Sequence, residues 1–135
     1  MKTRLLLCVF AIAIAGASQE REKYAGFTKS PTEHIINELK QPFEVKFVRG
    51  VVRRKEGEQE PLQNVLIEIK GLGDHDKIRR AKTDEHGQFK LNYVPSGTYK
   101  FKATLGGFQS VVGTIILSSK APKNSGIKIT MLIGV

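Results

Sequence analysis

Apolar and polar residues alternate along most of the chain from residue 43 onward. Seven short runs follow this period of two, and Gly, Pro, Asp or Asn residues separate them. A period of two is typical of β-strands that bury one face. Strands are therefore predicted over residues 43–52, 65–70, 78–83, 89–94, 98–105, 111–117 and 127–133. Seven short strands with turn residues between them predict an all-β fold, a seven-stranded antiparallel β-sandwich.

The segment that precedes the strands has a different pattern. Ser30-Pro31-Thr32-Glu33 has the form of a helix start, with a capping residue followed by proline at the first helical position. Ile35, Ile36 and Leu39 then fall on one helical face. A short amphipathic helix is predicted over residues 31–40, inside a leader that spans residues 18–42.

The runs 89–94 and 98–105 lie so close together that two arrangements compete. In a hairpin around Pro95-Ser96-Gly97, Lys90 would lie directly opposite Lys102, and like charges in that position cost stability. In a corner, the chain instead passes from one sheet to the other, both apolar rows meet across the core, and the lysines point outward. Proline also removes a donor from the strand ladder. The corner is favoured.

Six residues form the structural motif around this corner. The Asp84 side chain is expected to cap backbone amides in a turn, and Gly87 is expected to take a positive φ there. Pro95 and Gly97 form the corner, while Phe89 and Tyr99 face each other in the core. The corner also divides the lysines: Lys100 and Lys102 are expected on one outer face and Lys90 on the other, so that no face gathers a dense basic patch.

The amino terminus has the three parts of a secretory signal. Lys2 and Arg4 precede an apolar run that ends at Ala15-Gly16-Ala17, with small residues at the two positions that a signal peptidase requires. The run is too short to cross a bilayer core easily, which needs about 20 residues. Cleavage near Ala17 is therefore expected, with residues 1–17 as signal peptide and a secreted or periplasmic mature chain.

Removal of the signal changes both the charge and the chemistry. The formal charge of +9 falls by the two cations Lys2 and Arg4 to +7. The single cysteine, Cys8, is lost with it, so neither disulfides nor thiolate chemistry is available to the mature chain. A basic exported protein can make weak contact with anionic surfaces. Nucleic acid is not expected as a partner, because export separates the protein from cellular nucleic acid and no aromatic-basic binding motif is present.

Three stretches resemble a known family. The sequences "PLQNVLIEIKG" and "AKTDEHGQFKLNYVPSGTYKFKATLGGF", with the closing strand, are similar to the carboxypeptidase regulatory-like domain over residues 43–135. The resemblance implies a transthyretin-like (prealbumin-like), Ig-like β-sandwich of the carbohydrate-binding-like group. It also implies an accessory module rather than a catalytic domain. The chain ends Leu132-Ile133-Gly134-Val135, not in the Tyr-Arg-Gly-Ser ending of transthyretin-related hydrolases.

Candidate chemistry is sparse. Asp74-His75-Asp76 and Asp84-Glu85-His86 flank the same predicted strand, and a strand of that length, about 20 Å, separates them too far to share a metal ion. No serine or threonine has a convincing His and acid partner for nucleophilic catalysis. No catalytic residue, metal or cofactor is therefore expected, and the protein is not expected to be an enzyme.

Two functions fit what is left. The first is a structural or protein-interaction module of the cell envelope. The alternative is carbohydrate (glycan) binding, which usually needs exposed flat aromatic rings. The chain has no tryptophan, and Tyr93 and Tyr99 fall on inward rows. Tyr24, Phe27 and Phe108 are then the candidates for exposed rings. Neither the partner nor the oligomeric state follows from the sequence.

Overall fold

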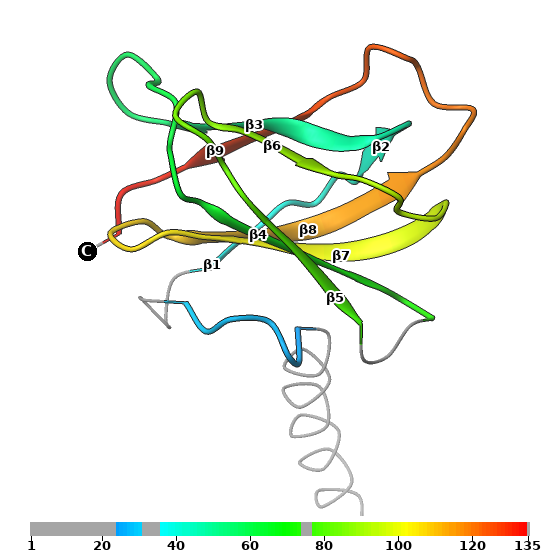
Figure 1. Ribbon diagram of the computed structural model, residues 1–135. Coiled ribbons are helices and arrows are strands. Elements are labelled where there is room, and N and C mark those ends of the chain that lie inside the picture. The colour runs from blue at the N-terminus through cyan, green and yellow to red at the C-terminus, as the bar shows by residue number, and fades with distance from the viewer. Residues whose placement is uncertain (1–23, 31–35, 74–76, 135) are drawn as a thin grey trace, which may run out of the picture.

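Two β-sheets pack face to face in the computed structural model, which describes residues 24–30, 36–73 and 77–134 (Figure 1). Within these ranges the strands are β1 (Ile36–Glu38), β2 (Phe43–Val45), β3 (Val48–Arg54), β4 (Leu66–Gly71), β5 (Ile78–Lys82), β6 (Gln88–Leu91), β7 (Gly97–Thr104), β8 (Ser110–Leu117) and β9 (Ile127–Met131). The six-stranded sheet has the order β1-β8-β7-β4-β5, and β2 also pairs with β8. The three-stranded sheet has the order β6-β3-β9. The predicted all-β sandwich is confirmed.

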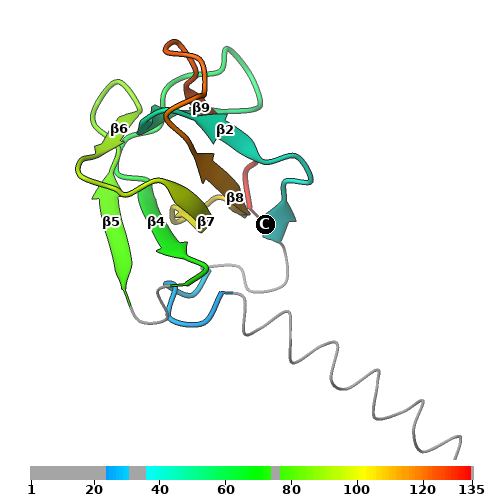
Figure 2. The same cartoon turned by 90° about the vertical axis from the view of Figure 1, so that its right-hand side faces the viewer.

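The inner faces of the two sheets form one hydrophobic core, and Figure 2 shows from the side the two sheets that enclose it. Val52 and Ile127 of the three-stranded sheet and Ile67 and Phe101 of the six-stranded sheet are fully buried. Each such side chain contributes about 1.5–3 kcal/mol when it leaves water. The period of two in the sequence follows from this, because every second side chain of a strand points into the core.

The predicted strand 43–52 is two strands in different sheets. β2 ends at Val45 beside β8, and β3 begins at Val48 beside β6 and β9. The apolar row shifts from odd to even positions at the adjacent residues Phe47 and Val48, and this shift marks the crossing. Phe47, at the crossing, leaves the buried row, and 48% of its surface is exposed.

The sheets are not purely antiparallel, which corrects the sequence-based prediction. β1 and β2 both pair with β8 in parallel, and β3 pairs with β9 in parallel. Parallel partners need a long connection, and here the partners come from opposite ends of the chain. Patterns within single strands carry no information about such distant pairing.

The predicted helix 31–40 falls partly outside the described residues, which omit 31–35. Its second half is wrong, because Ile36–Glu38 is the strand β1. This strand pairs with Ser110–Val112 on the edge of β8. A short amphipathic helix is marginal alone, so pairing with an open sheet edge prevails over the helical pattern. No helix long and apolar enough to cross a membrane occurs in the described part of the chain.

The corner between β6 and β7 is confirmed. β6 pairs with β3 in the three-stranded sheet, whereas β7 lies between β4 and β8 in the other sheet. The Tyr99 hydroxyl donates a hydrogen bond to the carbonyl oxygen of Pro95 and so ties the start of β7 to the turn. Phe89 and Tyr99 are both buried in the core, each with 5% of its surface exposed.

The segment 24–30 covers part of the outer face of the six-stranded sheet. Glu68 is fully buried there, and its carboxylate accepts hydrogen bonds from the Thr28 backbone N–H at 2.9 Å and from Arg80 Nε at 3.0 Å. In register, Glu68 lies between Arg80 and Lys102, so the charges alternate across the sheet. The leader therefore docks on the domain through these residues.

Lys102 is buried, contrary to the expectation that it points into solvent. Its burial lowers the pKa of the ammonium group, and the nearby Glu68 carboxylate offsets part of this effect. Tyr24 responds in the opposite direction: burial, with a smaller effect of the Glu38 carboxylate, raises the pKa of its hydroxyl. Both shifts follow from loss of water, which disfavours the charged form of each group.

We expect Gly87→Ala to destabilise the protein more than Gly57→Ala. Both glycines have a positive φ, 73° and 71°, and that alone costs about 1 kcal/mol for alanine. A Cβ on Gly87 would also lie 2.5 Å from the Val52 carbonyl oxygen, whereas one on Gly57 would meet nothing within 4 Å. The steric contact should add about 1–3 kcal/mol. Urea unfolding of both variants measures the difference, and equal losses would contradict the packing around Gly87.

We expect the stability of Lys102→Met relative to the native protein to depend on pH. Because the folded-state pKa of Lys102 is lowered, the unfolded chain binds more protons between that pKa and the ordinary value of 10.5. The native protein therefore gains stability relative to the variant as pH rises through this window. Urea unfolding of both proteins from neutral pH to 10.5 tests this, since titrating groups that do not interact with Lys102 cancel in the difference. A difference in unfolding free energy that stays constant over this pH range would show that burial does not shift the pKa of Lys102.

Candidate functional site

The outer face of the three-stranded sheet is open and basic. Its side chains are those that alternate with the buried row of Val48, Val52, Phe89 and Ile127. We call this surface the basic face. It consists of Arg49, Val51, Arg53, Gln88, Lys90, Lys128 and Thr130. None of these side chains is acidic, so cations here have no counter-charge within the sheet.

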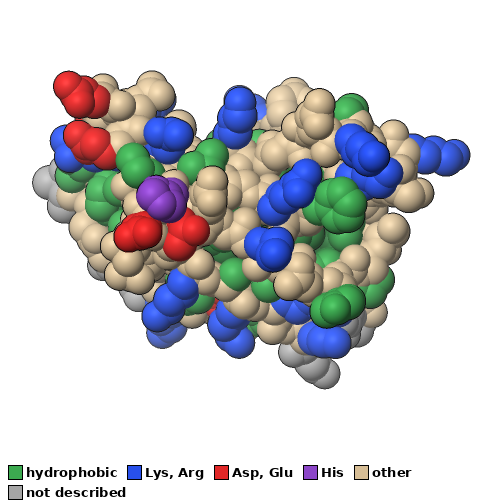
Figure 3. Space-filling model, turned by 45° about the horizontal axis from the view of Figure 1, so that its top comes forward, with side chains coloured by type: hydrophobic (Ala, Val, Ile, Leu, Met, Phe, Trp, Pro, Cys, Tyr) green, Lys and Arg blue, Asp and Glu red, His purple; other side chains and the backbone are tan. Residues whose placement is uncertain are grey.

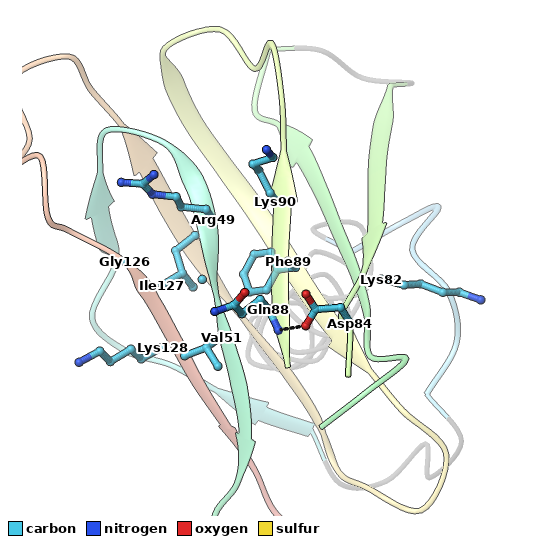
Figure 4. Close-up of a pocket in the computed structure, with 11 residues that line it drawn as sticks. Arg49, Val51, Lys82, Asp84, Gln88, Phe89, Lys90, Gly126, Ile127 and Lys128 are labelled. Atoms are coloured by element: carbon cyan, nitrogen blue, oxygen red, sulfur yellow. Dashed lines mark hydrogen bonds between the residues drawn. The ribbon is translucent and has the colours of Figure 1, made fainter. Parts of the chain in front are cut away.

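A hollow of about 640 Å³ lies on the basic face, and Figure 4 shows the side chains that line it. Three cations of this sheet line it, Arg49, Lys90 and Lys128, together with Lys82 of β5, whose side chain points away from the other three in Figure 4. None of them forms an ion pair within the described residues. In Figure 3, an oblique view onto this sheet, Lys and Arg side chains are spread over the whole visible surface, while acidic side chains gather at the left beside a histidine.

Asp84 is the one carboxylate that lines this hollow. Its Oδ1 accepts hydrogen bonds from the backbone N–H groups of His86 and Gln88, both at 2.9 Å. The dashed line in Figure 4 marks the bond to Gln88. These bonds hold the turn before β6 and occupy one oxygen of the carboxylate. The hollow therefore has a strong excess of positive charge, which suits an anionic ligand.

Arg49 and Lys90 face each other directly across β3 and β6. Side chains in such a pair have Cβ atoms about 4.5–5.5 Å apart, and like charges there are destabilising. The guanidinium of Arg49 is held in place from two sides. It lies 5.1 Å from the centroid of the Phe47 ring, and Nη2 donates to the Lys123 carbonyl oxygen at 3.5 Å. The chain thus positions two cations side by side on an exposed surface.

A second hollow, of about 510 Å³, continues past this pair. Arg49 and Lys90 line both hollows, and Lys46, Phe47 and Tyr93 line the second. The Tyr93 side chain is 99% exposed, and its backbone has a φ of 59°. A positive φ is uncommon for a non-glycine residue and costs about 1–3 kcal/mol. Two aromatic rings and three cations therefore meet at this end of the basic face.

The six residues of the sequence motif divide between the hollow and the corner. Asp84 and Phe89 line the first hollow, and Gly87 lies in the adjoining turn, where its N–H donates to the Asp84 carbonyl oxygen at 2.9 Å. Pro95, Gly97 and Tyr99 form the corner and the start of β7, away from the hollow. The motif residues therefore shape the turn and the corner, and the cations that line the hollow come from other positions.

The candidate metal cluster finds no support in the described residues. Asp74, His75 and Asp76 lie outside them. Elsewhere, no three His, Cys, Asp or Glu side chains within the described ranges converge on a point where a metal ion could bind. His86 Nε2 lies 3.5 Å from Glu85 Oε1, and both side chains are largely exposed.

Two sequence-based expectations about the surface are wrong. Tyr93 is exposed rather than inward, because the alternation of β6 ends at Leu91 and the corner turns the ring outward. Phe27 is buried against the six-stranded sheet rather than exposed. Tyr24 and Phe108 are partly buried.

Two cations from distant strands also lie side by side on one face, which the sequence analysis did not predict. Arg49 and Lys90 belong to strands far apart in the sequence, and their side-by-side position depends on the register of β3 with β6. The sequence contained part of this information. Arg49 and Lys90 each directly neighbour a residue of the buried row, Val48 or Phe89, and their side chains therefore had to point outward.

Comparisons with known proteins address the fold. The model of the carboxypeptidase regulatory-like domain matches residues 48–131, more than half of the chain. No curated protein matches the sequence. Among solved structures, 3-chlorocatechol 1,2-dioxygenase from Rhodococcus opacus 1CP is similar, with a TM-score of 0.50 and 13% identity over 90% of this chain and 78% of that one. Chlorocatechol 1,2-dioxygenase from Pseudomonas putida has a TM-score of 0.47 and 12% identity over 82% and 68%. At such identities the first likeness shows a shared β fold alone.

We expect Tyr93→Asn to stabilise the protein. Asparagine tolerates a positive φ better than tyrosine, and the 99% exposed ring contributes no packing that would be lost. The free energy of unfolding should rise by about 1 kcal/mol, the lower end of the range for a strained residue. Thermal and urea unfolding measure it. A clear loss of stability would show that the Tyr93 ring packs against the protein.

Proposed function

Given that the chain belongs to the carboxypeptidase regulatory-like domain family, we propose that it is a non-catalytic interaction module of the cell envelope that binds an anionic partner on its basic face. The family supplies the sandwich scaffold, and function has to be argued from the surface that this chain builds on it. The secretory pattern of residues 1–17 supports a location outside the cytoplasm.

The observation that carries the proposal is the arrangement of three cations, Arg49, Lys90 and Lys128, around one hollow. These cations lack an ion pair within the described residues, and Asp84 is already engaged by two backbone N–H groups. A folded protein gains nothing from crowding like charges, since they repel in the free state. An anionic partner would relieve this repulsion and add charge-assisted hydrogen bonds.

The two outer faces differ in part in how their charges are neutralised. On the six-stranded sheet, Arg80 and Lys102 flank the buried Glu68, and the segment 24–30 contacts this carboxylate through the Thr28 N–H. On the basic face, no such acid is placed between the cations, and Lys90 is exposed. Glu68 thus neutralises charge where the six-stranded sheet buries it, whereas Lys70 and Lys100, which face each other farther along the same sheet, are only half-buried and, like Arg49 and Lys90, have no ion pair within the described residues.

We expect the protein to bind a polyanion in a salt-dependent manner through this face. Labelled polyglutamate should bind at low salt and dissociate steeply as salt approaches physiological strength, where the screening length is about 8 Å. Arg49→Gln with Lys90→Gln should weaken binding at least tenfold, about 1.4 kcal/mol. Fluorescence anisotropy during a salt titration measures both effects.

The matched control is Lys40→Gln with Lys77→Gln. It removes the same charge from exposed positions near β1 and β5 of the six-stranded sheet. Binding by the control should stay close to that of the native protein. Equal losses in both double variants would show that net charge acts without a site, and no binding at low salt by the native protein would refute the proposal.

A further inference from the structure

The two hollows adjoin and form one elongated surface that runs from the basic face to the end of the sandwich, where Leu117 of the six-stranded sheet also lines the second hollow. They share Arg49 and Lys90, and the first continues towards Lys128 while the second continues towards Phe47 and Tyr93. Figure 4 shows Arg49 and Lys90 at one end of the first hollow, with Lys128 at the other. A ligand that follows this surface would contact cations along its length and aromatic rings at one end.

The two aromatic rings at that end, Phe47 and Tyr93, are exposed to solvent, and this exposure does not stabilise the free protein. Phe47 is 48% exposed and lies under the Arg49 guanidinium, 5.1 Å from its carbon to the ring centroid. Tyr93 is 99% exposed on a backbone of φ 59°, which tyrosine adopts with strain. Strained residues that persist at a surface cluster at binding sites. Tyr93 therefore has the properties of a residue kept for a ligand.

The ligand must then offer two features together: negative charges and a flat apolar face. A carboxylate can pair with the planar fork of Arg49 through two hydrogen bonds, and Lys90 beside it adds a second charge. A pyranose ring offers a face of C–H groups that fits flat against a tyrosine ring. An acidic peptide has the charges without a rigid flat face, and a lipid surface is flat where this site is hollow.

We propose that the basic face binds an acidic glycan, a polysaccharide built from sugar rings that carry carboxylates. Arg49 and Lys90 bind the carboxylate of one sugar, and the Tyr93 ring packs against the face of a neighbouring one. Lys128 takes a further carboxylate along the chain. This inference rests on the proposed function, because it names the class of the anionic partner.

The experiment compares ligands that separate charge from ring shape. Isothermal titration calorimetry of the native protein uses oligogalacturonate, the same oligomer fully methyl-esterified, polyglutamate of matched length, and vesicles that contain anionic phospholipid. Oligogalacturonate should bind at least tenfold more tightly than polyglutamate. Esterification keeps the rings and removes the charge, and it should weaken binding at least tenfold.

Three variants assign the roles. Tyr93→Asn should weaken oligogalacturonate binding about tenfold and leave polyglutamate binding unchanged, whereas Tyr93→Phe should retain both. Arg49→Gln should weaken binding of both anions. Circular dichroism and thermal unfolding confirm that each variant is folded, and the control Lys40→Gln with Lys77→Gln should behave as the native protein.

The other outcomes are each decisive. Equal affinity for polyglutamate, with no effect of Tyr93→Asn, would overturn the glycan inference and leave anion binding in place. Vesicle binding that depends on Tyr93, without oligomer binding, would replace the glycan with a membrane. No binding of any anion by the native protein would refute the proposed function together with this inference.

Discussion

The corner between β6 and β7 determines which side chains of both sheets face the core. The hydrogen bond from the Tyr99 hydroxyl to the Pro95 carbonyl closes this corner directly after the chain leaves the three-stranded sheet. Phe89 before it and Tyr99 after it both point inward. A slip of one residue in either strand would turn its whole buried row outward. The direction of Lys90 follows, because it must lie opposite to Phe89.

Charge is handled differently on the two outer faces. Under the segment 24–30, alternating signs allow Glu68 and Lys102 to be buried, and the cost of burial is still evident in the lowered pKa of Lys102. On the other face, Arg49 and Lys90 stay next to each other in water, where a high dielectric keeps their repulsion small. Water therefore screens the repulsion between these two cations until a bound partner displaces it.

Much of the sandwich could be predicted from the sequence, because strands with one buried face impose a period of two that local inspection detects. All seven predicted runs contain strands, and the like-charge argument about Lys90 and Lys102 led to the correct corner. The same argument did not foresee that Lys90 would lie opposite Arg49 instead. Strand pairing between distant segments is a property of the whole fold, which single-strand patterns do not encode.

The candidate site was missed for related reasons. Phe47 and Tyr93 lie where the alternation of buried and exposed positions is interrupted, at the crossing between the sheets and in the corner. The burial of Lys102 was not predicted, because the sequence does not show that Glu68 lies opposite it or that the segment 24–30 docks on Glu68. Positions that break a local rule are where functional residues are most often found, and here the basic face and the exposed rings both lie at such breaks.

The strands β1 and β2 have a consequence for the solubility of the domain. Both lie upstream of residues 48–131, and together they cover the outer edge of β8, an eight-residue strand of mainly buried side chains. A chain that began at residue 48 would present this long apolar edge with its backbone groups unpaired, which is a template for addition of another strand. At the opposite edge of the same sheet, β5 needs no such cover, because Arg79, Arg80 and Lys82 deter pairing by their charge. The upstream residues thus protect the domain from self-association, and residues 48–131 alone would lack this protection.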